Sequence, residues 1–282
     1  MKDPLLRRRS THEPELMDDP NCDPVALNAT YRLFGVINPL VTSWRPLYRQ
    51  WIRPVLRAAA REGRTATLLD VGSGGGDVAR SLSRWARRDG LPLAVTAIDP
   101  DLRAHAWAVA HDNGAGVDYR AEYSNALVAA GERFDAVVSN HVLHHLSQRE
   151  LTELLTDTSA LTRCVAVHND LRRSRLAWLL YWVGTLPLLR TRTLARFDGL
   201  LSIRRSYRRG ELAAVVPPGW SVRRQRFFRL LAVFPAHAEP GRTSSSQPSC
   251  GTLHVSRKTN WEGRLRSLLD QSMAGRWVRS GR

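Results

Sequence analysis

The stretch Thr67-Leu-Leu-Asp-Val-Gly-Ser-Gly-Gly-Gly-Asp77 decides the fold, because it joins a buried-strand pattern to a glycine-rich turn. The apolar residues before the first glycine suit a strand that is covered on both faces. Alternate glycines then let the backbone approach a ligand closely, and helical spacing follows from residue 78. The stretch therefore predicts a strand, a ligand-binding loop and a helix, with the ligand over the carboxyl end of the strand.

Strand and helix patterns alternate on the carboxyl side of this stretch. Buried-strand patterns lie at residues 67–71, 93–98, 116–120, 134–139 and 164–168, with helical patterns between them at 77–88, 102–111 and 151–161. A closing helix and a pair of strands are expected over residues 211–234. Repeated strand–helix units predict an α/β fold whose sheet is mainly parallel, with helices on both faces.

The flanking segments differ in composition from this core. Residues 1–20 are charged and contain three prolines, which predicts a mobile arm with little function. We expect an N-terminal helical lid, the core domain, an apolar lid insertion within it and a disordered basic tail, over residues 21–62, 63–235, 171–200 and 236–282 respectively.

Both lid segments are rich in apolar and aromatic residues. In the first lid these could form either core or a pocket for a flat substrate: Tyr31, Phe34, Trp44, Tyr48 and Trp51. The second run, residues 176–189, is shorter than the about 20 apolar residues that span a bilayer. It is either a buried helix or a lid over an apolar substrate, and its flanking arginines would also suit transient contact with a membrane surface.

The net charge of +16 comes from arginines spread along the chain. Scattered arginine is typical of a solvated surface, so no nucleic-acid partner is expected. The three cysteines lie too far apart for a Cys-rich zinc site. Arg7-Arg8-Arg9 is not followed by the apolar segment of an export signal, and we expect a cytoplasmic protein.

The glycine turn does not match the two commonest phosphate-binding loops. A P-loop needs Gly-Lys-Ser/Thr at the start of the helix, where this chain has Gly76-Asp77-Val78. A dinucleotide fingerprint needs a glycine at the position of Asp77, whose carboxylate would meet the pyrophosphate. The spacing instead suits a cationic sulfonium ligand with an amino-acid end, where Asp70 engages the ammonium and Asp99, after the second strand, accepts both ribose hydroxyls.

Three motifs together resemble the class I S-adenosylmethionine-dependent methyltransferases, small-molecule branch: Leu69-Asp-Val-Gly-Ser-Gly-Gly-Gly76, Ala97-Ile-Asp-Pro100 and Phe134-Asp-Ala-Val-Val-Ser-Asn-His-Val-Leu-His-His-Leu146. The resemblance implies a Rossmann-like seven-stranded sheet with the last strand antiparallel, and S-adenosylmethionine as the cofactor. The cofactor-binding residues that it indicates are Asp70, Gly72, Ser73, Gly74, Gly76, Asp99, Pro100, Asn140 and His141. The family's usual acid for the adenine is replaced by Tyr123, so Glu122, Ser124, Asn125 or stacking would have to serve.

Histidines after the fourth and fifth strands are the candidate acid–base groups. Methyl transfer is an in-line displacement, and a phenolic acceptor with a pKa near 10 benefits from a general base such as His. We rank His144 and His168 first, then His145, with Asp170 as the orienting group. No metal site is expected, because no cysteine or carboxylate lies at ligand spacing from these rings.

The sequence thus predicts an enzyme that methylates an oxygen, or an electron-rich carbon, of a hydrophobic aromatic or polyketide-like small molecule. An RNA methyltransferase is the first alternative, motivated by the charge. A non-catalytic subunit that keeps the fold is the second, although the intact cofactor motifs argue against it.

Overall fold

The computed structural model describes residues 6–236, which belong to one compact unit. The tail predicted over residues 236–282 therefore lies, but for its first residue, outside the described residues. The elements in chain order are η2 (Leu16–Asp18), α1 (Pro24–Val41), α2 (Trp44–Leu47), η3 (Tyr48–Ile52), α3 (Arg53–Arg61), β1 (Ala66–Val71), α4 (Asp77–Arg88), β2 (Leu93–Ile98), α5 (Leu102–Ala110), β3 (Val117–Arg120), α6 (Ser124–Ala129), β4 (Phe134–Asn140), α7 (Gln148–Leu161), β5 (Thr162–Leu171), α8 (Arg175–Gly184), η4 (Leu186–Arg190), α9 (Ala195–Arg205), α10 (Arg209–Val215), β6 (Ser221–Gln225) and β7 (Arg229–Pro235).

The strands form one seven-stranded sheet in the order β3-β2-β1-β4-β5-β7-β6. The pairs β1–β2, β1–β4, β2–β3 and β4–β5 are parallel, whereas β7 runs antiparallel to both β5 and β6. This arrangement confirms the expected Rossmann-like sheet with an antiparallel last strand.

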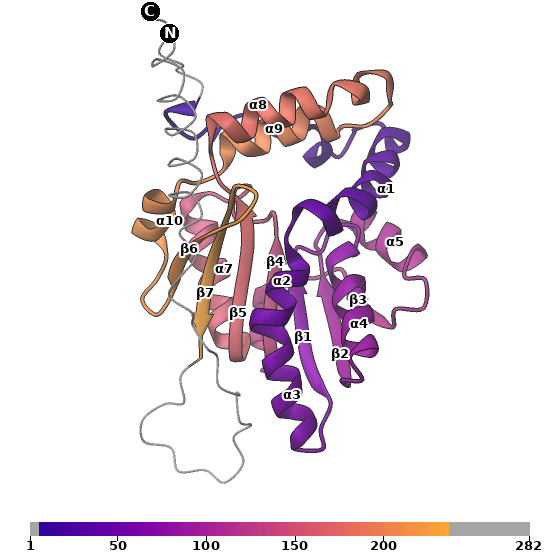
Figure 1. The fold of residues 1–282 in the computed structure, drawn as a ribbon, viewed down its shortest axis with the longest axis vertical. Coiled ribbons are helices and arrows are strands. Elements are labelled where there is room, and N and C mark those ends of the chain that lie inside the picture. The colour runs from indigo at the N-terminus through magenta and orange to yellow at the C-terminus, as the bar shows by residue number, and fades with distance from the viewer. Residues whose placement is uncertain (1–5, 237–282) are drawn as a thin grey trace, which may run out of the picture. The chain divides into compact units, whose positions relative to one another are not determined.

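Helices cover the sheet on both faces, which is why β1 and β4 are continuous runs of buried residues. On one face α6, α7 and α10 pack on a core that includes Leu69, Val137 and Leu155. On the other, α3 contacts β1 and α4 contacts β2 and β3, and Figure 1 shows α3 and α4 in front of the sheet. In α4 the buried Val78, Leu82 and Ala86 recur every four residues, so one stripe of the helix faces the strands.

The parallel strands bring several loops to one edge of the sheet. The glycine turn after β1 and the loops after β2, β4 and β5 all leave the carboxyl ends of their strands, where α/β folds bind ligands. Helices α8 and α9 lie side by side across this edge, and α1 lies beside it (Figure 1). The fold therefore places a cover of helices over the expected site.

Three local features differ from the sequence predictions. Helix α9 is a separate helix that continues past residue 200, where the sequence analysis expected the 171–200 insertion to end. Strand β5 extends through Leu171, beyond its predicted end at residue 168. Strand β5 is longer because seven of its residues pair with β7, a contact between segments distant in sequence. Residues 6–20, expected to be a mobile arm, pack on α9, where the backbone N–H of Leu16 donates to Asp198 at 2.7 Å.

Among residues 6–236 no helix has the length and apolarity that crossing a bilayer requires.

Candidate active site

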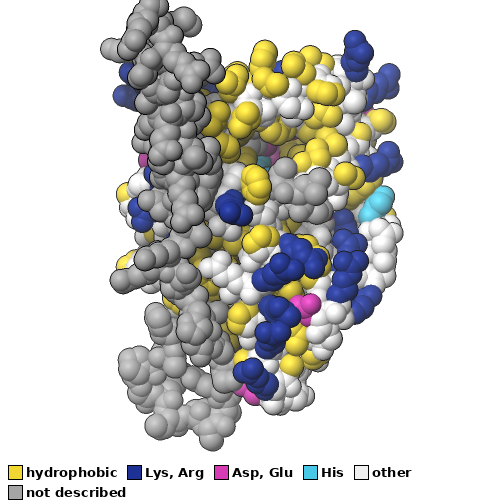
Figure 2. Space-filling model, in the orientation of Figure 1, with side chains coloured by type: hydrophobic (Ala, Val, Ile, Leu, Met, Phe, Trp, Pro, Cys, Tyr) yellow, Lys and Arg dark blue, Asp and Glu magenta, His cyan; other side chains and the backbone are white. Residues whose placement is uncertain are grey.

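A cavity of about 850 Å³ opens at the carboxyl edge of the sheet. Its lining comes from the glycine turn, the loops after β2 and β4, α1, α8, α9, the β6–β7 turn and the segment that precedes α1. Figure 2 shows hydrophobic side chains gathered around a hollow at the α8–α9 end of the molecule. One continuous space therefore joins the predicted cofactor loop to the predicted lids.

The glycine turn keeps backbone close to this cavity. Gly74 has a φ of +51°, and no atom lies within 4 Å of the position that a Cβ would take there. Its backbone N–H donates to Asp99 Oδ2 at 2.7 Å, which ties the turn to the end of β2. At Gly72 a Cβ would lie 2.6 Å from Val142, so this glycine is also required by packing. Gly72, Ser73 and Gly74 all line the cavity, whereas Gly76 is packed against Tyr119 and Arg80.

Asp70, at the carboxyl end of β1, is buried in the cavity wall with 1% of its surface exposed. Neither of its oxygens makes a hydrogen bond of ordinary geometry within the described part of the chain. Burial, and then the charges of Asp77 and Asp99, raise the pKa of this carboxyl well above its usual range. A buried carboxyl without an opposing charge is costly unless a cation reaches it, so Asp70 fits a ligand with a positive group.

Asp99 and Pro100 line the cavity beside the turn. Asp99 accepts backbone N–H bonds from Gly74 and, at 2.9 Å, from Asp101. Burial raises the pKa of Asp99, although these two bonds oppose the shift. Each carboxyl oxygen keeps a further lone pair, so the pair of ribose hydroxyls expected here has acceptors available.

The residues expected near an adenine do not meet the cavity. Tyr123 is 68% exposed, and the Ser124 hydroxyl donates to Asp157. None of residues 122–125 lines the cavity, whose wall beyond Asp99 is formed by Asp101 and Ala104 at the start of α5. The prediction of an adenine contact after β3 is therefore not supported by the cavity as it stands.

Asn140 and His141 follow β4 and line the cavity, as predicted for cofactor-binding residues. The Asn140 side chain accepts from Asn169 at 3.2 Å, and the backbone N–H of His141 donates to the Asn169 carbonyl at 3.0 Å. His141 has a φ of +64°, which is uncommon for a residue other than glycine. Burial, and next the charge of Arg229, hold the pKa of His141 well below its usual range, so the ring is neutral.

His144 lies at the centre of a buried acid–base group in the cavity wall. Its Nδ1 contacts Asp170 Oδ1 at 2.6 Å and its backbone N–H donates to Asp170 Oδ2 at 2.8 Å. Its Nε2 lies 3.5 Å from Glu15 Oε1. Burial alone would lower the pKa of His144, but the charges of Asp170 and Glu15 outweigh it and raise the pKa to about 9. Asp170 is thus placed to orient the ring, the role that the sequence analysis expects of it.

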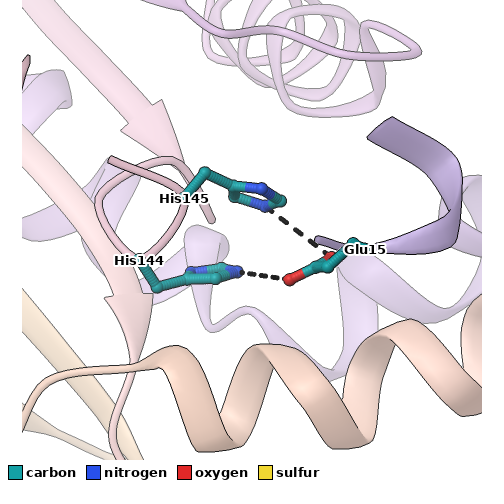
Figure 3. Close-up of side chains that lie close together, drawn as sticks. All are labelled: Glu15, His144 and His145. Atoms are coloured by element: carbon teal, nitrogen blue, oxygen red, sulfur yellow. Dashed lines mark ion pairs between the residues drawn. The ribbon is translucent and has the colours of Figure 1, made fainter. Parts of the chain in front are cut away.

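His145 and Glu15 extend this group, as Figure 3 shows. Glu15, of which 2% is exposed, lies beside both imidazoles, with Oε2 3.8 Å from His145 Nε2. His145 Nδ1 contacts Asp18 at 3.1 Å, and the Ser202 hydroxyl of α9 donates to Glu15 at 2.8 Å. Burial opposes ionisation of Glu15, but its contacts with the two histidines outweigh burial and lower its pKa. The segment expected to be a mobile arm with little function therefore supplies a buried carboxylate to the site.

This group could also hold a divalent metal ion. One ligand atom from each of Glu15, His144 and His145 lies within 4.8 Å of the others. Carboxylates also contact Nδ1 of both rings, the arrangement that commonly orients histidine ligands. The sequence analysis expected no metal site because no carboxylate lies at ligand spacing from the histidines. Spacing along the sequence could not indicate Glu15 as a ligand, because only the fold brings the N-terminal segment next to the two histidines.

His168, ranked beside His144, does not reach the cavity. It is fully buried, its Nδ1 contacts the Ser139 hydroxyl at 2.5 Å, and its ring stacks on Trp220 with centroids 5.2 Å apart. Burial lowers the pKa of His168 to about 3. A neutral ring inside the core cannot exchange protons with a substrate in the cavity, so the structure separates His168 from the site.

The aromatic residues of the first lid divide into two groups. Tyr31 and Phe34, on α1, line the cavity, whereas Trp44, Tyr48 and Trp51 are buried in the core and do not line it. The second lid contributes Ala177, Leu180, Tyr181, Gly184 and Leu188 to the lining. Sequence reasoning missed Phe228 and Arg229 of the β6–β7 turn, because a terminal hairpin carries no motif of its own.

Comparison with known proteins supports the class indicated by the fold and cavity. The family model described as a methyltransferase domain matches residues 43–196, more than half of the chain, and the chain belongs to this family. The expected class I S-adenosylmethionine-dependent methyltransferase is thereby confirmed as the class of the protein, and the buried Asp70, the bare Gly74 and Asp99 fit that cofactor.

Among curated relatives, the chain is similar to ubiquinone biosynthesis O-methyltransferases. It is 42% identical over 83 residues to that of Methylobacterium sp. (strain 4-46), which covers 29% of this chain and 31% of the relative. It is 32% identical over 130 residues to that of Cereibacter sphaeroides, covering 41% and 49%. The match thus spans less than a third of the first relative and about half of the second.

Solved structures share the fold at low sequence identity. The plantazolicin methyltransferase BpumL in complex with SAH aligns with a TM-score of 0.54 and 11% identity, over 79% of this chain and 93% of that one. An O-methyltransferase family protein from Burkholderia thailandensis aligns with a TM-score of 0.51 and 17% identity, over 79% and 62%.

Proposed function

We propose that this protein transfers a methyl group from S-adenosylmethionine to an oxygen of a hydrophobic aromatic small molecule. The observation that carries the proposal is the single cavity in which the glycine turn and its two acids face the buried His144 group. The ubiquinone O-methyltransferase relatives support the same reaction class. Oxygen is preferred to an electron-rich carbon as the acceptor because His144 and its acids form a proton-accepting group.

Residues of the cofactor end would hold the two ends of S-adenosylmethionine. Asp70 would engage its ammonium, the glycine turn would pack against its methionyl chain, and Asp99 would accept from its ribose hydroxyls. When bound, the cofactor supplies an electrophilic methyl group on a positively charged sulfur. The chain itself contributes positioning and the exclusion of water, the main requirements of an in-line displacement.

His144 would accept the proton of the acceptor hydroxyl at Nε2 through Glu15, which lines the cavity and whose Oε1 lies 3.5 Å from that nitrogen. Its Nδ1–H is directed to Asp170, which leaves Nε2 of the neutral ring as the acceptor and stabilises the cation that forms. A base with a pKa of about 9 matches a phenol, whose pKa is near 10, better than an ordinary histidine does. Because the ring is protonated at neutral pH, the reaction should accelerate as the pH approaches 9.

The rest of the cavity supports an apolar, aromatic acceptor. Phe34, Leu180 and Leu188 line it, from helices that are expected to act as lids. The outer surface of the same region exposes further large apolar side chains, Leu176, Leu179, Trp182, Val183, Leu189 and Phe197. Arg175, Arg190, Arg192 and Arg196 lie among them in sequence. This combination supports transient contact with a membrane surface, from which a lipophilic acceptor could enter.

We also propose a cytoplasmic location.

The test is a transfer assay on the purified full-length protein. Incubation with methyl-labelled S-adenosylmethionine and a panel of lipophilic phenols and quinols should give labelled products that carry one added methyl group. Binding of S-adenosylhomocysteine without transfer to any acceptor would contradict the enzymatic proposal and favour a non-catalytic subunit. Transfer to structured RNA alone would favour the other alternative.

A further inference from the structure

The reaction proposed above leaves a buried arginine of the cavity without a role. Arg229 is the first residue of β7, it lines the cavity, and only 2% of its surface is exposed. A guanidinium is almost always charged, and burying a charge is costly unless it is paired. The groups that pair with Arg229 therefore indicate whether its role is structural or ligand-binding.

Arg229 lacks the partners that a structural arginine has. Its Nη1 donates to Nε2 of the neutral His141, and its Nε has no hydrogen-bond partner among the described residues. No carboxylate of residues 6–236 lies within ion-pair distance of it. Asp170, whose charge opposes the effect of burial on Arg229, is already engaged with His144 and the backbone N–H of Leu171. Burial lowers the pKa of Arg229 to about 10, so it remains a cation at neutral pH.

For comparison, Arg173 is equally buried but fully paired. It donates to the Leu6 and Ser206 carbonyls and forms an ion pair with Glu211. Where a buried guanidinium has a structural role in this protein, its N–H groups are therefore hydrogen-bonded and its charge is paired. Arg229 is left with unused donor capacity on a cavity wall, which is the arrangement of an anion-binding side chain.

The position of Arg229 assigns it to the acceptor end of the cavity. Asp70 is on β1, and the sheet runs from β1 through β4 and β5 to β7. Three strand spacings of about 4.8 Å separate the two strands, roughly 14 Å. The cofactor acids Asp70 and Asp99 thus lie toward one end of the cavity and Arg229 toward the other.

The turn before Arg229 is built at a conformational cost. Phe227 and Phe228 have φ values of 55° and 56°, in the left-handed region that Gly and Asn usually occupy in turns. Both residues line the cavity next to Arg229. Backbone strain of this kind is retained where it positions functional groups. The turn offers an aromatic wall directly beside a buried cation.

We propose that the methyl acceptor is an aromatic acid, whose carboxylate pairs with Arg229 while its ring packs against the Phe227–Phe228 turn. The inference rests on the proposed function and adds the class of substrate. A carboxylate also occurs on the methionyl end of the cofactor, so the experiment separates the two sources.

The probes are 6-hydroxy-2-naphthoate and its neutral isostere 6-hydroxy-2-naphthamide. Calorimetry on the full-length protein saturated with S-adenosylhomocysteine should give a Kd about tenfold or more lower for the acid than for the amide, the value of a charge-assisted hydrogen bond. Arg229→Gln should bring the two probes within about threefold of each other. Because the Gln amide can still donate to His141, the affinity for S-adenosylhomocysteine should stay within about threefold of the wild-type value. Arg226→Gln, an exposed residue of the same hairpin, should behave as the wild type.

Equal affinity of the wild-type protein for acid and amide would overturn the inference whether or not the variant folds. Loss of S-adenosylhomocysteine binding in a folded Arg229→Gln protein, checked by circular dichroism, would also overturn it and assign the arginine to the cofactor. Transfer to neutral phenols without preference for the acid leaves the proposed function intact and removes only this inference. Tighter binding of the acid without methyl transfer to any acceptor would support this inference and contradict the proposed function.

Discussion

The two ends of the cavity are built in different ways. The cofactor end consists of Asp70, the glycine turn and Asp99, all within about 30 residues of sequence at the ends of neighbouring strands. The acceptor end brings together Glu15, His144, Asp170, α8 and Arg229, which are spread over most of the described chain. A local motif fixes the donor, whereas the acceptor end depends on how distant segments pack.

Because the two ends of the cavity have different roles, substitutions at the acceptor end should lower kcat and leave the affinity for the cofactor unchanged. The sharpest case is His144→Gln, which removes the base but keeps a side chain of similar length. We expect kcat to fall by about a thousandfold, within the usual range for loss of a general base, with an unchanged Kd for S-adenosylhomocysteine. His12→Gln, at an exposed histidine, is the matched control. A fall of less than threefold in kcat would remove His144 from the reaction.

The same histidine should make stability depend on alkaline pH. The pKa of His144 is about 9 in the folded protein and near 6.5 when unfolded. A raised pKa means that its contribution to the free energy of unfolding is complete below pH 6.5 and is lost as the pH rises through 9. The loss should be roughly 3 kcal/mol at most, and His144→Gln should abolish it. Denaturant titrations of both proteins between pH 6 and 10 measure it, and parallel curves would contradict it.

At the cofactor end, a substitution should act on cofactor affinity first. Asp99→Ala removes the expected ribose contacts and the acceptor that ties down Gly74. The Kd for S-adenosylhomocysteine should rise by about a hundredfold, the loss of two charge-assisted hydrogen bonds. Asp118→Ala, at an exposed acid on β3, serves as the control for calorimetry. An unchanged Kd would show that the cofactor does not lie over the end of β2.

A smaller effect is expected inside the glycine turn. Gly74→Ala introduces no clash but places alanine at a φ of +51°. The strain should lower the free energy of unfolding by about 1 kcal/mol. Gly72→Ala adds a contact with Val142 and should cost more. Thermal denaturation of the two variants compares them, and equal stability of both with the wild type would mean that the turn is not held in the left-handed conformation.

The same division explains what the sequence could and could not predict. The strand and helix bounds around the glycine turn were predictable, because each element there carries its own periodicity and each acid follows its own strand. Glu15 was assigned to a functionless arm, because a single glutamate between prolines has no local signal. Its role comes from Ser202 and the two histidines, which only the fold brings near.

His168 shows the opposite error. Its place at the end of the strand predicted over residues 164–168 suggested a catalytic group, but β5 continues through Leu171 and keeps the ring against Trp220 in the core. The extension depends on pairing with β7, which a pattern within the β5 segment does not encode. Arg229 was missed for the same reason, since its burial is a property of the β5–β7 pair.

Glu15, from the N-terminal segment, and His144 are proposed to act as one proton-accepting group at the acceptor end. The pH dependence of kcat/KM for a neutral phenol, in the wild type and in Glu15→Gln, tests it most directly. We predict that kcat/KM rises up to pH about 9 in the wild type and reaches its plateau at lower pH in Glu15→Gln, because the neutral amide no longer stabilises the protonated ring. The Kd for S-adenosylhomocysteine should not change. Superimposable profiles for the two proteins would contradict the claim.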